Sequence, residues 1–210
     1  MSGWNIVVVF GAKGRYSLNQ VRHIAAEVER GIATPCKKWM YTNQEETFGW
    51  SKIPLARGWR DNFAKLEVFR PDTPIEGGVL YLDLACVIGR PIELPPWEET
   101  LTKGRLMTWR DPWRSDVPHA TGVMAWVAGT VTDPYEDFLA NVRYEEPGIR
   151  QWGDDYIINR TMKGRLDFID TFLKVRSYKA HKITSREEAD VITFHGKPRP
   201  WDVGWSLVNN

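Results

Sequence analysis

Apolar runs alternate with amphipathic segments along the first fifth of the chain. Residues 5–10 (NIVVVF) are almost wholly apolar, which is typical of a strand buried on both faces. Residues 17–31 have apolar positions at helical spacing, with Ser17 and Gln20 placed for a capping box and a glycine at the end. Residues 37–42 (KKWMYT) predict a second strand. This βαβ opening predicts an α/β fold with a mainly parallel sheet.

The rest of the chain continues this alternation. Residues 59–71 place apolar side chains at positions 63, 66 and 69 on one face of a predicted helix. A helix over residues 133–143 has Asp133 as its N-cap and Pro134 at its first position. Another short helix is predicted over residues 153–164. Further strands are predicted at residues 77–84, 105–111, 121–129 and 191–194.

Composition narrows the protein class without naming a function. The 210 residues are 42% hydrophobic, which is enough for one core, so we expect a single domain over residues 1–210. The formal net charge of +1 gives no global signal for nucleic acid or a membrane surface. Two cysteines, no apolar run of membrane-spanning length and no signal-peptide pattern predict a cytoplasmic protein.

Asp83 is the first candidate for chemistry, because it lies at the C-terminal end of the apolar strand of residues 77–84 (GGVLYLDL). Open α/β sheets bind ligands beyond the carboxyl ends of their strands. A carboxylate at that place needs a cation, a hydrogen-bond donor or water. The strand alone leaves a ligand site and a turn-capping acid about equally favoured.

Three other segments carry candidate residues, each with an ordinary structural alternative. In FHGKPRPW, His195 follows a strand, Gly196 permits close approach of a ligand to the backbone, and Lys197 suits a phosphate. Taken alone, the segment slightly favours a simpler interpretation, a proline-braced turn with a solvated lysine. Asp154 and Asp155 open a helix, where capping is the common role. Lys179, in SYKAHK, reads as a solvated edge, and no GxSxG, Walker or zinc-spacing motif is present.

Taken in order, seven segments resemble a nucleotide-sugar glycosyltransferase of the GT-A fold. They are similar to small phage and bacterial glycosyltransferases, distantly similar to the glycogenin and lipopolysaccharide galactosyltransferase family. The strand LYLDL together with the loop HGKPRPW is the most specific part. The segments are residues 5–22 (NIVVVFGAKGRYSLNQVR), 65–71 (KLEVFRP), 77–84 (GGVLYLDL), 122–129 (GVMAWVAG), 152–157 (WGDDYI), 177–182 (SYKAHK) and 194–201 (FHGKPRPW).

The resemblance implies a metal site that bridges protein and donor. In the family, a D-x-D motif ends the strand, and its two acids hold Mn²⁺ (or Mg²⁺) on the donor's diphosphate. Asp83 matches the first acid, and His195 matches the third protein ligand. The metal would stabilise the charge that builds on the departing diphosphate.

The resemblance also implies a site for a nucleotide sugar, with a UDP-sugar as the expected donor. Lys197 matches a lysine on the diphosphate, and Gly196 and Lys179 lie in the matching donor-binding segments. Asp154 matches an acid near the transferred sugar, with Asp155 in place of the usual Gln. Such an acid can help an oxocarbenium-like centre, and transfer with retention is implied. The uracil and ribose are expected at Phe10, Gly11 and Tyr16, with Lys65 near the nucleotide.

Ala85 is the departure from this pattern, because it occupies the second acid of D-x-D and has no ligand atom. Two explanations are open. The chain is a natural variant that uses Asp83, His195, water and the diphosphate, or Ala85 was introduced to silence an active enzyme. Intact His195 and Lys197 favour the second hypothesis, under which Ala85→Asp raises divalent-dependent turnover by orders of magnitude.

The acceptor is the least defined part. Relatives of this kind are often phage-encoded, which would place the protein in the host cytoplasm. Hydroxymethylated pyrimidines in double-stranded DNA are one expected acceptor, and segments such as residues 109–116 (WRDPWRSD) interleave Arg and Trp as DNA contacts require. A glycan, lipid or protein acceptor is the alternative. A protein that binds sugar nucleotides without catalysis, or a metal-dependent nucleotidyltransferase, also remains open.

Overall fold

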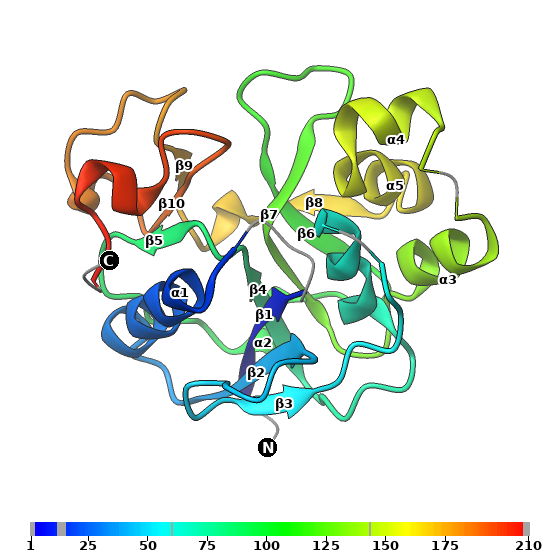
Figure 1. The fold of residues 1–210 in the computed structure, drawn as a ribbon, viewed down its shortest axis with the longest axis horizontal. Helices are drawn as coiled ribbons and strands as arrows, with labels where there is room; N and C mark the ends of the chain where they lie inside the picture. Colours follow the sequence, from blue (N-terminus) through cyan, green and yellow to red (C-terminus); the bar gives the residue numbers. More distant parts are fainter. Residues whose placement is uncertain (1–2, 12–15, 60, 143, 208–210) are drawn as a thin grey trace.

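The structure is a computed structural model that describes residues 3–11, 16–59, 61–142 and 144–207. Its centre is a seven-stranded sheet with the order β3-β2-β1-β4-β7-β6-β8 (Figure 1). The pairs of β1 with β2, β1 with β4, β2 with β3 and β6 with β8 are parallel, whereas β7 is antiparallel to both β4 and β6. The strands are β1 (Trp4–Phe10), β2 (Cys36–Thr42), β3 (Ser51–Ile53), β4 (Gly78–Leu82), β6 (Leu106–Arg110), β7 (His119–Val127) and β8 (Leu166–Phe168). The α/β prediction is therefore confirmed.

Strand β1 shows why the central strands read as continuous apolar runs. All seven of its residues are buried. Ile6 and Val8 contribute to the core on one face of the sheet, and Val7 and Val9 to the core on the other. Both faces of the sheet are covered, so side chains pointing in either direction must be apolar.

Different elements cover the two faces (Figure 1). On one face lie α1 (Leu18–Gly31) and a small second sheet of order β5-β10-β9. On the other face lie η1, α3 and α5, which contact one another. The small sheet comprises β5 (Cys86–Ile88), β9 (Val175–Ser177) and β10 (Val191–Thr193). The helices and 3-10 turns are η1 (Asp61–Phe69), α2 (Trp97–Thr100), α3 (Asp133–Ala140), α4 (Pro147–Trp152), α5 (Asp154–Thr161), η2 (Ile169–Thr171), η3 (Arg186–Glu188) and η4 (Pro200–Val203).

Helix α1 begins as predicted, with Ser17 as N-cap and the Gln20 side chain accepting from the Ser17 backbone N–H at 2.7 Å. Its last residue is Gly31, and packing explains why a glycine stands there. A Cβ at position 31 would lie 2.1 Å from Cγ2 of Ile88 in β5. The glycine lets α1 pack directly on the small sheet.

Two helix predictions need correction. Residues 59–71 do not form an α-helix: the described segment Asp61–Phe69 is a 3-10 helix. Phe63, Leu66 and Phe69 are three residues apart, so the three turns of a 3-10 helix align them on the buried face. The helix predicted at residues 133–143 has Thr132 as its N-cap, which makes Asp133 its first residue and Pro134 its second.

No helix within the described part of the chain combines the length and apolar character required to cross a membrane.

Candidate functional site at the carboxyl ends of β1 and β4

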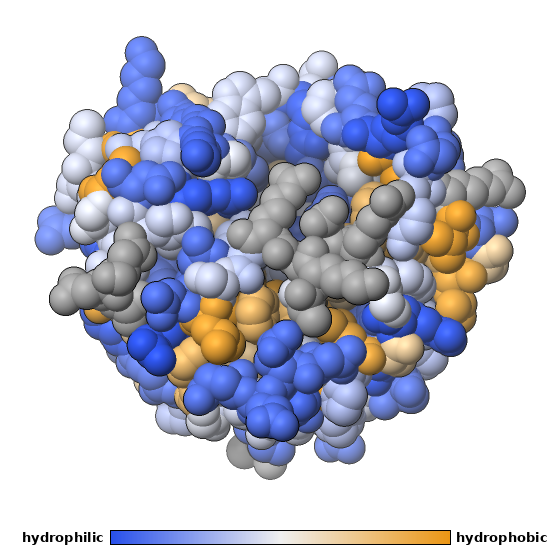
Figure 2. Space-filling view, viewed as in Figure 1, coloured by the Kyte–Doolittle hydropathy of each residue, from blue (hydrophilic) through white to orange (hydrophobic). Residues whose placement is uncertain are grey.

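A cavity of about 240 Å³ lies where β1 and β4 end. From β1 the chain proceeds to β2 on one side of the sheet, whereas β4 pairs on the other side, so the strand order reverses here. Ligands of open α/β sheets bind at such a switch point. Figure 2 shows hydrophilic side chains around the hollow in the upper part of the molecule. The described lining residues are Val9, Phe10, Gly11, Tyr16, Asn62, Lys65, Tyr81, Asp83, Leu84 and Arg199.

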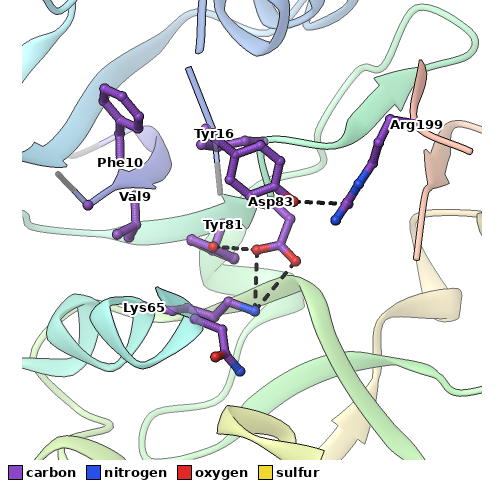
Figure 3. Close-up of a pocket in the computed structure, with 10 residues that line it drawn as sticks. Val9, Phe10, Tyr16, Lys65, Tyr81, Asp83 and Arg199 are labelled. Atoms are coloured by element: carbon purple, nitrogen blue, oxygen red, sulfur yellow. Dashed lines mark hydrogen bonds and ion pairs between the residues drawn. The ribbon is translucent and has the colours of Figure 1, made fainter. Parts of the chain in front are cut away.

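Asp83 follows β4 and faces the cavity with a partly exposed carboxylate (Figure 3). Its Oδ1 accepts from the Tyr81 hydroxyl at 2.6 Å and lies 3.2 Å from Lys65 Nζ. Tyr81 and Asp83 are two residues apart, so strand alternation directs both to one side. Asp83 is thus neutralised and oriented by its own neighbours.

Lys65, from η1, links Asp83 to Asp154 of α5. Its Nζ lies 2.8 Å from Asp154 Oδ2 and 3.2 Å from the Thr121 hydroxyl, and its side chain is 8% exposed. Burial alone would lower the pKa of Lys65, but the carboxylates of Asp154 and Asp83 outweigh burial and raise that pKa. Lys65 is therefore charged at neutral pH.

Asp154 and Asp155 do not cap α5, whose N-cap is Gly153. Asp154 accepts from Asn62 at 2.5 Å, and Asp155 binds Arg114 at 2.6 Å. The Thr121 hydroxyl lies 2.7 Å from Asp154 and 2.6 Å from Asp155, yet it has one hydrogen and donates to only one of them at a time.

The environments of these two acids differ. Burial would raise the pKa of Asp154, but Lys65 and hydrogen bonds hold it below its usual value. Burial and the nearby Asp154 raise the pKa of Asp155. Both acids lie behind Lys65, outside the described lining of the cavity.

Arg199 forms the opposite wall of the cavity. Its guanidinium donates to the Tyr16 hydroxyl at 3.0 Å and to the Phe194 carbonyl oxygen at 3.1 Å (Figure 3). Burial, followed by Asp83, raises the pKa of the Tyr16 hydroxyl, so this group stays protonated. Both partners of the Arg199 guanidinium are neutral oxygens.

Two of the predicted donor-binding lysines lie near this wall. Lys179 and Lys197 are both exposed. A Cβ at Gly196 would lie 3.8 Å from Lys179 Nζ, so this lysine reaches the loop that precedes Arg199. Lys197 and Gly196 are not among the described lining residues of the cavity.

His195 packs between two tryptophans. Its ring stacks on Trp109 at 5.3 Å and meets the edge of Trp113 at 5.4 Å. Its Nε2 lies 3.1 Å from the Thr193 hydroxyl, and burial lowers its pKa, so the ring is neutral at pH 7. Trp113 itself is 52% exposed.

These residues do not match the metal site that the resemblance implies. Within the described residues, no three His, Cys, Asp or Glu side chains are grouped so that they could hold a metal ion. Ala85 is 2% exposed and belongs to an apolar cluster with Ile192 and Phe194. Asp83 is bound by Lys65 and Tyr81, and His195 by Thr193. The donor set present does not fit a protein-held Mn²⁺.

Five of the residues that the sequence predicts to bind the donor line this cavity, namely Phe10, Gly11, Tyr16, Lys65 and Asp83. Asn62, Tyr81 and Arg199 were not predicted. The alternation of Tyr81 with Asp83 was a usable signal. Arg199 stands between two prolines in the same loop as Lys197, and only the fold distinguishes which cation faces inward.

Comparisons with known proteins identify the fold. No family model and no curated protein matches the sequence. The glycosyltransferase GlyE of Streptococcus pneumoniae TIGR4 aligns over 100% of this chain with a TM-score of 0.69 and 15% identity. The chain spans only 61% of that protein's length. The galactosyltransferase LgtC, solved in complex with donor and acceptor sugar analogs, aligns over 94% of this chain and 89% of its own, with a TM-score of 0.58 and 12% identity. The chain therefore has the GT-A fold of these glycosyltransferases.

Proposed function

We propose that this chain is a glycosyltransferase that moves a hexose from a nucleotide sugar, with UDP-hexose as the donor, to an acceptor hydroxyl. One observation carries the proposal: the cavity at the switch point of a GT-A fold combines aromatic rings, two cations and a carboxylate. Phe10 and Tyr16 offer faces for a base, and Arg199 offers a fork for phosphate. The donor complex of LgtC adds support by analogy.

The chemistry follows from the charges at the site. The bond between the anomeric carbon and the phosphate oxygen breaks, and its electron pair stays on the diphosphate. The acceptor oxygen bonds to the carbon, and its proton passes to the diphosphate or to water. Lys65 holds Asp83 in a fixed position at the cavity, where the partly exposed carboxylate favours an oxocarbenium-like centre, while Asp154 behind Lys65 fixes the position of the ammonium group. A divalent ion would stabilise the diphosphate when bound, but the side chains that the structure describes do not fit a protein-held metal ion.

For the acceptor we propose a hydroxymethylated pyrimidine in double-stranded DNA. The exposed Trp113 beside His195 supports this proposal, because an extruded base needs an aromatic surface. The neighbouring basic residue contributes less than expected, since Arg114 is bound by Asp111 and Asp155. Glycan, lipid and protein hydroxyls are the alternative acceptors.

The test is a donor-hydrolysis and transfer assay with UDP-glucose and related donors. Duplex DNA with and without hydroxymethylated bases serves as acceptor, and NMR of the product checks the implied retention. We expect product with modified DNA and its loss in Asp83→Asn, while the exposed Asp72→Asn keeps wild-type activity. Product without DNA moves the acceptor to another class. Donor binding without hydrolysis or transfer would contradict the enzyme and leave a sugar-nucleotide-binding protein.

A further inference from the structure

The two walls of the cavity hold their charges differently. On one wall, Asp83 and Asp154 share the Lys65 ammonium at 3.2 and 2.8 Å. On the other, the hydrogen bonds of the Arg199 guanidinium to described residues go to a phenol oxygen and a carbonyl oxygen. Arg199, Lys197 and Lys179 form no ion pair with any residue that the structure describes. A half-buried arginine without a carboxylate partner favours an anion as its ligand.

Position 85 gives the complementary observation. Ala85 lies in an apolar cluster with Ile192 and Phe194, and the partly buried Tyr16 and Trp205 pack against that cluster. An aspartate there would place a carboxylate among apolar side chains, away from water, which is costly without a partner. The packing around Ala85 suits an apolar side chain, and this favours a natural variant over a silenced enzyme.

We propose that this site binds the donor's diphosphate through the Arg199 guanidinium, with Lys197 and Lys179 at the rim, and needs no divalent ion held by protein carboxylates. This inference rests on the proposed function in taking a nucleotide sugar as the ligand. The arginine fork matches two phosphate oxygens, and the rim lysines add charge from the solvent side. Asp83 stays bound to Lys65, so it does not repel the incoming anion as a free carboxylate would.

The experiment measures binding of UDP and of inorganic diphosphate by calorimetry, in excess EDTA and again with Mn²⁺. For wild type, the dissociation constants in the two conditions should agree within about threefold. Arg199→Gln should weaken binding of both probes about 10- to 100-fold, because it removes a charge-assisted fork. Arg199→Lys should bind both probes more weakly than wild type and more tightly than Arg199→Gln.

The matched control is Arg90→Gln, which removes the same charge from an arginine paired with Asp190 on the surface. Binding to this control should equal that of wild type. Thermal melts of each variant check that the fold persists. The inference is overturned if EDTA abolishes binding and Mn²⁺ restores it, or if Arg199→Gln behaves like Arg90→Gln.

Ala85→Asp gives an independent readout. We expect a lower melting temperature and no gain in Mn²⁺-dependent binding of UDP. A variant that keeps its melting temperature and binds UDP more tightly with Mn²⁺ would overturn the inference and support a silenced D-x-D motif.

The outcomes separate this inference from the proposed function. If inorganic diphosphate binds in EDTA through Arg199 but no donor is hydrolysed or transferred, the glycosyltransferase proposal fails and the anion site stands. If transfer occurs and strictly requires Mn²⁺, the function stands and the metal-free inference fails.

Discussion

The two walls of the cavity differ in where their charges find partners. The inner wall is formed by Lys65 and Asp83, with Asp154 behind them; the charges of these three side chains are compensated within the protein, and Lys65 and Asp154 are almost fully buried. The outer wall is formed by Arg199, with Lys179 and Lys197 nearby, and these three side chains form no ion pair with a described residue. We therefore expect the inner wall to contribute to folding stability as much as to function, and the outer wall to contribute mainly to ligand binding. Substitutions should separate the two.

The largest effect is expected for Lys65→Met. The substitution leaves the buried Asp154 carboxylate without its cation, and breaking a buried pair costs about 3–5 kcal/mol. Urea unfolding measures the loss in the free energy of unfolding. The control Lys103→Met removes an exposed lysine and should change that free energy by less than about 0.5 kcal/mol. Equal losses in the two variants would show that the inner wall is not a compensated cluster.

A smaller but clear loss is expected for Gly153→Ala. Gly153 has φ +61° and ψ −133°, and a Cβ there would lie 2.2 Å from Asn62 Nδ2. Strained backbone of this kind costs about 1–3 kcal/mol, and the clash disturbs the hydrogen bond from Asn62 to Asp154. Gly58→Ala is the control, since a Cβ there meets nothing within 4 Å. A loss in Gly58→Ala as large as that in Gly153→Ala would contradict the explanation.

The pH dependence of stability tests the partly buried carboxyl group of Asp155. Burial and Asp154 raise the pKa of Asp155 in the folded protein, whereas an unfolded aspartate titrates near about 3.9. Asp155 therefore stabilises the fold fully below that value, and its contribution falls as pH rises through the folded pKa. Asn at position 155 does not titrate, so the stability of Asp155→Asn relative to wild type should rise with pH across this window.

Urea titrations of both proteins over about pH 4–7 test this sign, because the window starts near the unfolded pKa. The contribution of Asp154 has the opposite sign, since its pKa is lowered, but it is present in both proteins. A difference that stays flat with pH, or falls, would show that Asp155 carries no raised pKa.

The smallest effect on stability is expected for Arg199→Gln. Its guanidinium makes two hydrogen bonds to neutral oxygens and no ion pair with a described residue, so the free energy of unfolding should change by about 1 kcal/mol or less. Urea unfolding of this variant beside Lys65→Met gives the contrast directly. A loss in the free energy of unfolding close to that of Lys65→Met would show that Arg199 contributes to folding stability as strongly as the inner wall does.

Much of the fold could be predicted from the sequence because the central strands are buried on both faces and leave unmistakable apolar runs. Of the three short strands of the small sheet, β10 was predicted, whereas β5 and β9 were not, because they join it through distant pairing, such as that of Val191 with Ile88, which leaves little local pattern. The 3-10 geometry of η1 was hidden for another reason. Apolar residues spaced by three are compatible with either helix, and contacts with the sheet and α3 decide between them.

A residue of the candidate site could be predicted where its position depends on one strand or helix, and could not where its role depends on contacts between several elements. Asp83 follows a strand, so its place at the sheet edge could be read directly. The roles of Asp154 and Asp155 depend on Lys65 and Thr121 from two other elements, which makes capping the natural but wrong expectation. The assignments of His195 and Lys197 as ligands stay predictions, since neither lines the cavity among the described residues.

The pairing of β10 with β5 has a consequence for the order of assembly. Thr193 pairs with Cys86 in an antiparallel register, and the next residue, Phe194, packs in one apolar cluster with Ala85. The segment that leads to Arg199 is thereby joined to the segment after Asp83. Residues 89–190, about half of the chain, are synthesised between the two strands, so the cavity gains its second wall only after Arg199 has been added. Contacts of such long sequence separation form late and slowly in folding. Ligand binding is thus an assay for chains extended through residue 199, because a nascent protein that has only the central sheet still lacks Arg199.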